Sequence, residues 1–394
     1  MILMDRPIPY KNNLCPVKII SPKTDKSCFF GYYDLKAYDD SDRYHLCNIA
    51  DFEDRMQGPD DVLQLGVIDL DNGNFEKIDE TKSWNFQQGA MLQWSRAEKD
   101  VVFYNVYKNG EYLTVKKNVK TGAKSYCPAC ANISRDGKYG LKVNFMRIFD
   151  FRPGYGYCNT KDPYFDIAQP ENDGVFLVDI EEGTEKLILT YPDMVKAIGV
   201  SGLEGDKFVV NHITFNPVGD RFMLLLRNFP EEGKTWGTAL IVSDLEGNMK
   251  SYMGLSLYSH YDWMGDYDLF GFCKHDDVND LFNVNINTEE WTRIANHGLT
   301  NRDSHCWFTK DKSMFIGDTY PDKEGYRQIY LYDFKKEEYT KLIDAYSPWH
   351  PSKITDIRTD LHNRFNTKET KISYDTVQNG KREIAELDFE AFKK

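Results

Sequence analysis

Histidines in short polar and aromatic settings recur along the second half of the chain. Three of them occur in Asn211-His212-Ile213, Ser259-His260-Tyr261 and Ser304-His305-Cys306. Each lies before or at the start of a strand-and-turn pattern that recurs along the sequence. Equivalent points of a circular repeat protein converge on its axis, so these three imidazoles would meet there. Imidazole binds divalent metals and transfers protons near neutral pH. The spacing therefore predicts either a metal site or an acid-base site.

The repeat itself is visible in apolar segments that alternate and then run into an Asp or Asn before a turn. Seven such segments end at Asp69, Asn118, Asp179, Asp244, Asn285, Asp333 and Asp388. Their ends lie 41 to 65 residues apart, which matches the spacing of propeller blades of four strands with insertions. We therefore predict an all-β fold, a seven-bladed β-propeller of four-stranded antiparallel blades, formed by residues 1–394 as a single domain.

A second repeated piece supports the same fold. The segments 132–138, 215–220 and 308–312 each read as a short turn before another apolar strand. Asp, Asn and Gly are favoured in such turns because the chain must reverse with a residue at positive φ. No long amphipathic helix pattern competes with the strand pattern.

The net charge and the cysteine content of the chain limit the kinds of partner that it can bind. The formal net charge is −13, so the summed field repels nucleic acid and anionic membranes, although a local basic pocket can still hold a small acidic substrate. No export signal and no apolar stretch of membrane-spanning length is present. The eight cysteines are scattered, and Cys127 and Cys130 form the only close pair. We expect a cytoplasmic protein with reduced cysteines that binds neither nucleic acid nor membrane.

Two long gaps in the repeat predict loop insertions near residues 144–170 and 191–209, on the face that binds ligands in most propellers. The first insertion contains Arg147, Arg152, Tyr155 and Tyr157. Guanidinium groups suit a carboxylate and aromatic faces suit a sugar ring. The alternative is an aromatic-rich loop that packs on the rim of the propeller.

Several segments resemble bacterial propellers related to oligogalacturonate lyases. They are Phe29-Phe-Gly-Tyr-Tyr-Asp34, Trp84 to Trp94, Asn211-His-Ile-Thr-Phe-Asn-Pro217, Ser259-His-Tyr-Asp-Trp263 and Asp318-Thr-Tyr-Pro-Asp322. The resemblance covers nearly the whole chain. It implies a seven-bladed propeller that cleaves uronic-acid oligosaccharides by β-elimination with a bound divalent ion, manganese first and zinc second.

The resemblance also implies roles for single residues. His212 matches the position of a catalytic histidine, and His260 and His305 match metal-ligand histidines. Asp303 stands where the family has another histidine ligand, and a glutamine ligand would fall near Thr300. Because a carboxylate binds hard divalent ions, the implied metal set is His260, Asp303 and His305. The same departures are also compatible with an altered or lost metal site.

Elimination from a uronate removes a proton next to a carboxylate, whose charge must be neutralised by a metal ion or an arginine. We expect His212 to be the base and Arg147 or Arg227 to bind the carboxylate. Arg227 is favoured because its strand follows directly from the turn after His212.

Further residues are candidates for contact with substrate. Gln88 could bind sugar hydroxyls at the axis, and His362 and Arg364 open a late blade close to Asp360 and His350. For each histidine the alternative is a structural hydrogen bond between blades.

Two other classes of function compete with a lyase. A non-catalytic propeller that binds glycans or proteins fits the same fold, and a hydrolase would fit the many carboxylates, although no pair stands out. A serine peptidase is disfavoured because no Gly-x-Ser-x-Gly motif is present. A lyase predicts that His212, His260 and His305 converge with an arginine in an open pocket. A binding platform predicts that they are buried in separate networks.

Overall fold

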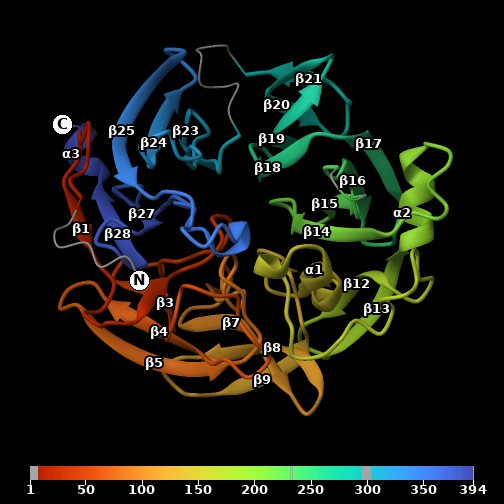
Figure 1. Ribbon diagram of the computed structural model, residues 1–394, viewed down its shortest axis with the longest axis horizontal. Helices are drawn as coiled ribbons and strands as arrows, with labels where there is room; N and C mark the ends of the chain where they lie inside the picture. Colours follow the sequence, from red (N-terminus) through yellow and green to blue (C-terminus); the bar gives the residue numbers. More distant parts are fainter. Residues whose placement is uncertain (1–7, 231, 233, 295–302, 394) are drawn as a thin grey trace.

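The computed structural model describes residues 8–230, 232, 234–294 and 303–393. Seven four-stranded sheets stand in a ring around a central axis (Figure 1). All the strand pairs within the sheets are antiparallel. The prediction of an all-β, seven-bladed β-propeller is confirmed.

The blades follow one another along the chain, each from its innermost to its outermost strand. Blade 1 has β2 (Ser27–Phe29), β3 (Tyr44–Ala50), β4 (Leu63–Asp69) and β5 (Asn74–Thr81), and blade 2 has β6 (Gln93–Trp94), β7 (Val101–Lys108), β8 (Glu111–Asn118) and β9 (Lys124–Pro128). Blade 3 has β10 (Asn132–Ile133), β11 (Tyr139–Lys142), β12 (Gly174–Asp179) and β13 (Thr184–Thr190), and blade 4 has β14 (Phe208–Phe215), β15 (Arg221–Asn228), β16 (Thr238–Asp244) and β17 (Met249–Ser256).

Blade 5 has β18 (Tyr258–Trp263), β19 (Asp268–His275), β20 (Val278–Asn285) and β21 (Trp291–Arg293), and blade 6 has β22 (Trp307–Phe308), β23 (Met314–Asp318), β24 (Tyr326–Asp333) and β25 (Glu338–Tyr346). Blade 7 combines β26 (Arg364–Phe365), β27 (Lys371–Thr376) and β28 (Glu383–Asp388) with β1 (Val17–Ile19) from the beginning of the chain. Val17 pairs with Leu387 in this sheet, so the two ends of the chain close the ring.

The repeated Asp or Asn of the sequence lies at the end of the third strand of each blade. In six blades its side-chain oxygen accepts a hydrogen bond from the backbone N–H two residues later, at 3.0 to 3.1 Å; the six are Asp69, Asn118, Asp179, Asp244, Asn285 and Asp333. This turn is a local alternative to a strand ladder. It ends the third strand and starts the reversal into the fourth.

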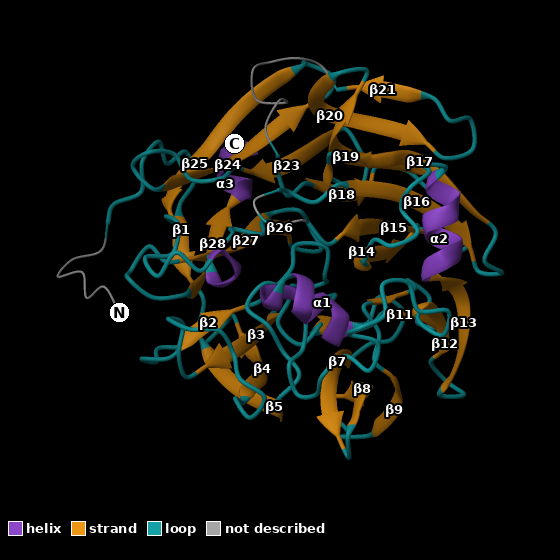
Figure 2. Cartoon of the chain, turned by 45° about the vertical axis from the view of Figure 1, so that its right-hand side comes forward, coloured by secondary structure: helices purple, strands orange, loops and turns teal. Residues whose placement is uncertain are grey.

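Both predicted insertions contain a short helix. Helix α1 (Phe145–Phe151) and the 3₁₀ helix η1 (Pro153–Tyr155) lie between β11 and β12, and α2 (Tyr191–Ile198) follows β13. Figure 1 places α1 near the axis and α2 at the rim, and Figure 2 shows α1 across the front of the blades. Asn144 caps α1 by accepting from the N–H groups of Met146 and Arg147, as helix N-termini require.

Two further short helical turns, η2 (Thr355–Ile357) and α3 (Phe389–Lys393), complete the secondary structure of the described residues. Across those residues, no helix has the length and apolarity needed to cross a membrane. All eight cysteines are free thiols.

Candidate functional site

Four histidines lie within or just before the innermost strands of four consecutive blades. His212 is in β14 and His260 in β18, whereas His305 and His362 shortly precede β22 and β26. His212, His260 and His305 therefore occupy equivalent points of the repeat, as predicted. The ring centroids of His260 and His305 are 3.9 Å apart, and those of His305 and His362 are 4.5 Å apart. The propeller thus brings imidazoles from three blades into contact at the axis.

The backbone at these positions departs from regular strand geometry. The pairing of β14 with β15 shifts between Val210 and Ile213, and that of β18 with β19 shifts between Ser259 and Tyr261. His212 and His260, inside these bulges, have φ values of 138° and 33°, and His362 has a φ of 45°. Bulges re-aim a side chain next to functional sites, and positive φ in a residue other than glycine is held only by its surroundings.

Tyr32 and Tyr33, after β2, fill the space between the histidines. The ring of Tyr32 stacks on His212 at 5.0 Å and meets His362 edge-on at 5.0 Å, and its hydroxyl lies 3.4 Å from Nε2 of His212. The ring of Tyr33 lies 5.0 Å from that of His305. The segment 29–34 was quoted for the family resemblance, but the sequence did not assign these tyrosines to the site.

A cleft of about 880 Å³ opens above this cluster. It is lined by His212, His260, Asp303, Arg152, Tyr155 and Arg227, among others. These six residues were all selected from the sequence, and they come from blades 4 and 5, the segment before β22 of blade 6, and the first insertion. Of the three histidines predicted to converge in an open pocket, His212 and His260 line this cleft together with Arg227, whereas His305 does not.

Three arginines give the cleft a positive wall. Arg227 donates to Oγ1 of Thr238 at 3.2 Å and to the side-chain oxygen of Asn211. Arg152 lies with its guanidinium 4.2 Å from the ring centre of Tyr155. Arg358 donates from Nη2 to the hydroxyl of Tyr155 at 3.1 Å. These planar donors suit a carboxylate.

The sequence missed Arg358 together with several other lining residues. Asp356, Trp236, Tyr320 and Trp349 also line the cleft. Trp236, Tyr320 and Trp349 are 38%, 37% and 50% exposed, respectively, and the rings of Tyr320 and Trp349 stack at 5.6 Å. Such exposed aromatic faces suit the apolar face of a sugar ring. They lie on connections between strands, where no repeated pattern marks them.

Burial favours the neutral form of His212 and His260. Desolvation lowers the pKa of His212 well below its usual value, and Arg227 and Arg152 lower it further. Burial also lowers the pKa of His260, although Asp303 opposes that shift. Desolvation lowers the pKa of Arg227 to about 10, so the guanidinium keeps its charge at neutral pH. A neutral His212 beside charged arginines is able to accept a proton.

Each histidine at the axis is oriented by a second group. Nδ1 of His260 lies 2.5 Å from the carboxylate of Asp303, and Nδ1 of His305 lies 2.9 Å from both carboxylate oxygens of Asp318. Nδ1 of His362 donates to the carbonyl oxygen of Gly31 at 2.9 Å. A metal-binding histidine usually donates its outer ring nitrogen in this way.

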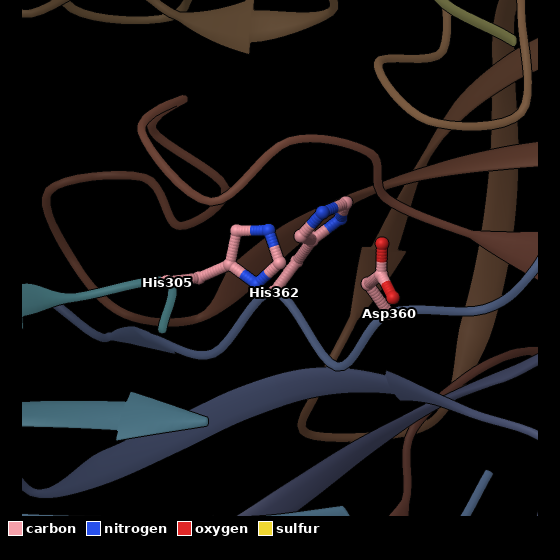
Figure 3. Close-up of side chains that lie close together, drawn as sticks. All are labelled: His305, Asp360 and His362. Carbon is pink, nitrogen blue, oxygen red and sulfur yellow. The ribbon is translucent and has the colours of Figure 1, made fainter. Parts of the chain in front are cut away.

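Two imidazole nitrogens without a hydrogen-bond partner show whether a metal ion fits this site. Nε2 of His305 and Nε2 of His362 are buried and have no hydrogen-bond partner. The same two histidines and Asp360 form a cluster in which one ligand atom of each residue lies within 4.8 Å of those of the others. Figure 3 shows the two rings side by side with Asp360 next to them. Two orphaned imidazole nitrogens and a carboxylate are a donor set that fits a divalent ion.

The metal set implied by the resemblance is only partly reproduced. His260, Asp303 and His305 lie together, but His260 and Asp303 bind each other. Of the three, only His305 belongs to the ligand cluster found among the residues that the structure describes. The position of the expected glutamine ligand, near Thr300, lies outside the described residues.

Six predicted site residues do not line the cleft: Arg147, Tyr157, Gln88, His305, His362 and Arg364. Arg147 is fully buried, 3.4 Å from Asp162, and also donates to four backbone carbonyl oxygens, including that of Phe208 at 2.6 Å. Its guanidinium is therefore occupied by the protein, which corrects the expectation that it binds a substrate carboxylate. Tyr157 is buried with its hydroxyl against Asn105 at 3.0 Å.

Gln88 and Arg364 also lie outside the cleft lining. Gln88 is half-buried, and its backbone N–H donates to the side-chain oxygen of Asn85 at 2.7 Å. Arg364 is fully buried, with Nη2 donating to the carbonyl oxygen of Gly31 at 3.3 Å. The candidate His362 lies beneath the cleft, against His305.

Comparison with known proteins supports the fold. No protein-family model matches the sequence, and no curated protein matches it either. Among solved structures, an oligogalacturonate lyase from Vibrio parahaemolyticus superposes with a TM-score of 0.66 at 14% identity, covering 97% of this chain and 96% of that one. An oligogalacturonate lyase in complex with manganese gives 0.68 at 15% identity, covering 97% of both chains.

A more distant match, the tricorn protease, gives a TM-score of 0.53 at 10% identity and covers 94% of this chain but 35% of that one. The resemblance to oligogalacturonate lyases that was stated from the sequence is thus confirmed for the fold over nearly the whole chain. At these identities the likeness concerns the fold, and the chemistry depends on the residues of this chain.

Proposed function

We propose that the protein is a lyase that cleaves uronic-acid-containing oligosaccharides by β-elimination in the cleft between His212 and Trp349. The observation that carries the proposal is the lining of the cleft: three arginines and exposed aromatic rings surround a neutral histidine. An acidic sugar offers a carboxylate for the arginines and a ring face for the aromatics. The net charge of −13 makes this local positive wall selective for a small ligand rather than for nucleic acid.

The chemistry follows from the substrate. In β-elimination the C5–H bond next to the carboxylate breaks, the C4–C5 double bond forms, and the C4–O bond breaks with the departing sugar. His212 accepts the C5 proton, because burial keeps its imidazole neutral. Arg227 pairs with the carboxylate, onto which negative charge moves as the proton leaves. Arg152 and Arg358, which line the same cleft, help to orient the acidic substrate.

A divalent ion would neutralise the carboxylate and stabilise the carbanion that forms. The solved manganese complex of a lyase with this fold supports manganese as the first choice, and zinc is the second because imidazole and carboxylate also bind it. His305 presents a free Nε2 to such an ion. His260 and Asp303 lie beside it, as the resemblance implied. The eight free thiols support a reducing, cytoplasmic location.

The test is turnover of defined oligouronates with and without Mn²⁺, measured as the ultraviolet absorbance of the unsaturated product. Replacing His212 with Ala should lower kcat by about 10²- to 10⁴-fold, the usual contribution of a general base. Replacing Arg227 with Lys should lower it by about 10²-fold or more. The matched control is His275→Ala, because His275 stacks on Trp291 at 4.4 Å, away from the cleft lining.

Two outcomes would contradict the proposal. Tight binding of oligouronates without product would make the propeller a glycan-binding platform, the main alternative. Absence of both binding and turnover across uronate, neutral and amino-sugar oligomers would remove the carbohydrate assignment.

A further inference from the structure

We infer that the chain has a second ligand site, at the end of the propeller axis opposite the cleft, and that this site binds a small polyhydroxylated anion, a sugar acid or a sugar phosphate. Arg96, Arg135 and Lys312 hold the anionic group. Asp34 accepts hydrogen bonds from the hydroxyl groups of the same ligand. The site goes beyond the proposed lyase function and does not depend on it.

A pocket of about 450 Å³ lies where the innermost strands end. Strand β18 begins at the cleft, which Tyr258 and His260 line, whereas Asp262 near its end lines the pocket. Blade 6 repeats this order, because Asp303 before β22 lines the cleft and Phe308 at the end of β22 lines the pocket. The innermost strands therefore run from the cleft to the pocket, and the two sites lie at opposite ends of the axis.

Three cations of the pocket come from equivalent turns of three blades. Arg96 lies between β6 and β7, Arg135 between β10 and β11, and Lys312 between β22 and β23. Each of these turns joins the first strand of a blade to the second. The turns with Arg135 and Lys312 belong to the repeated piece that the sequence showed at 132–138 and 308–312. Because such turns converge on the axis, their side chains line one pocket.

The protein leaves these cations without a direct ionic partner. Within the part of the chain that the structure describes, no ion pair joins Arg96, Arg135 or Lys312 to an acidic residue. Nη2 of Arg96 donates to the backbone carbonyl of Asp34 at 3.2 Å, and Nζ of Lys312 donates to that of Trp263 at 3.1 Å. Desolvation and then the charge of Arg135 lower the pKa of Arg96 to about 10, so its guanidinium stays charged at neutral pH. Such unpaired positive charges attract an anion.

The carboxyl of Asp34 lacks hydrogen-bond donors. Its Oδ1 is buried and has no hydrogen-bond partner. Burial, followed by the charge of Asp262, raises the pKa of Asp34 to about 7, as expected of a carboxyl that no cation contacts. A hydroxyl group of the ligand supplies a donor. The half-buried ring of Trp307, also in the lining, offers an apolar surface to the carbon skeleton of the ligand.

The mixture of charges in the pocket defines the class of ligand. An anion without hydroxyl groups meets the repulsion of Asp34 and Asp262, and a neutral sugar gains nothing from the three cations. An anionic group with hydroxyl groups beside it satisfies both sets. Carboxylate and phosphate both bind Arg and Lys, so sugar acids and sugar phosphates share this chemistry. The volume lies within the range of about 300–1,000 Å³ that is usual for small-molecule sites.

The test is isothermal titration calorimetry of the full-length protein with D-glucose 6-phosphate, D-galacturonate, D-galactose and inorganic phosphate. At least one of the two sugar anions should bind, and the tighter of the two identifies the anionic group. Arg135→Gln should weaken this binding by about tenfold or more, because hydrogen bonds to charged groups are the strong ones. Arg135 is exposed in a turn, so the variant should keep its fold.

The matched control is Lys138→Gln. Lys138 lies in the same turn as Arg135, 3.7 Å from Asp136, and does not line the pocket. The control removes the same charge from the molecule as Arg135→Gln does. Since salt screens exposed charges at a distance, it should change the affinity by less than about twofold.

Three results would overturn the inference. The first is that neither sugar anion binds. The second is that the sugar anion binds Arg135→Gln as tightly as it binds the parent, which would place the ligand elsewhere, in the cleft if the ligand is galacturonate. The third is that galactose or inorganic phosphate binds as tightly as the sugar anion.

The result is separable from the proposed lyase activity. Arg135→Gln should keep the kcat of the parent on oligouronates, because Arg135 does not line the cleft. A protein that binds a sugar anion through Arg135 but releases no unsaturated product supports this site and removes the lyase. A protein that cleaves oligouronates, with sugar-anion binding unchanged in Arg135→Gln, supports the lyase and removes this site.

Discussion

Replacing Arg147 with Met is expected to destabilise the whole fold, because this arginine holds the first insertion onto β14. Its guanidinium is fully buried with Asp162 at 3.4 Å, and it also donates to the carbonyl oxygens of Tyr164 and Ile167. Removing the cation leaves the buried carboxylate of Asp162 without its counter-charge. Breaking one side of a buried ion pair costs about 3–5 kcal/mol.

This loss of folding free energy corresponds to a decrease in the melting temperature, Tm. The entropy of unfolding is about 2.1 cal/mol/K per residue, which is about 0.8 kcal/mol/K if all 394 residues melt as one unit. A loss of about 3–5 kcal/mol then lowers Tm by roughly 4–6 °C. Differential scanning calorimetry measures this shift directly.

Two further variants make the measurement interpretable. Arg221→Met is the control, because Arg221 and Asp220 form a pair whose side chains are 39% and 40% exposed; such surface pairs contribute about 0–1 kcal/mol. The double variant Arg147→Met with Asp162→Asn should recover much of the lost stability, because no bare charge remains buried. An unchanged Tm for Arg147→Met, together with lost cleavage of oligouronates, would refute this reasoning. Arg147 would then act on the substrate and not on the stability of the fold.

Three more predictions concern other parts of the molecule. Burial lowers the pKa of His45 to about 3, so below pH 6.5 this histidine is protonated in the unfolded chain but stays neutral in the native state. The native state therefore loses about 2 kcal/mol of stability between pH 6.5 and pH 5. His45→Gln should abolish this loss, as measured by urea unfolding at both pH values. Gly31→Ala should cost at least about 1–2 kcal/mol, because Gly31 has a φ of 123° and an added Cβ would lie 3.0 Å from the backbone of Gln88; an unchanged Tm would contradict this. Trp349→Ala should weaken oligouronate binding about tenfold, roughly 1.4 kcal/mol by calorimetric titration, with Tm unchanged because the side chain is half exposed; equal affinity would exclude stacking on this ring.

Much of the fold could be predicted because its signals are local. An Asp or Asn that ends the third strand, such as Asp69 or Asp244, accepts hydrogen bonds from N–H groups of its own turn. Each blade is therefore marked by a short sequence segment, and the spacing of these segments gives the spacing of the blades. The equivalence of His212, His260 and His305 followed from the same repeat. The closure of the ring by β1 and β28 was not predicted, because it joins segments from opposite ends of the chain.

The cleft was only partly predictable. Arg152 and Tyr155 were found because they share one insertion, whereas Arg358, Tyr320 and Trp349 lie on connections between strands that carry no repeat. Arg147 and Arg152 looked alike in sequence. They differ because one guanidinium meets buried carbonyl oxygens and the other lies over Tyr155 at the cleft.

The sequence by itself determined the seven-bladed architecture and the gathering of histidines at its axis, because both depend on patterns that repeat every few dozen residues. Only the tertiary structure decided what each histidine can do. The free nitrogen of His362 is set by Gly31, which lies 331 positions away, and the free nitrogen of His305 is set by Asp318. Proton placement on an imidazole depends on the group that its other nitrogen meets, and that partner exists only once the blades have closed.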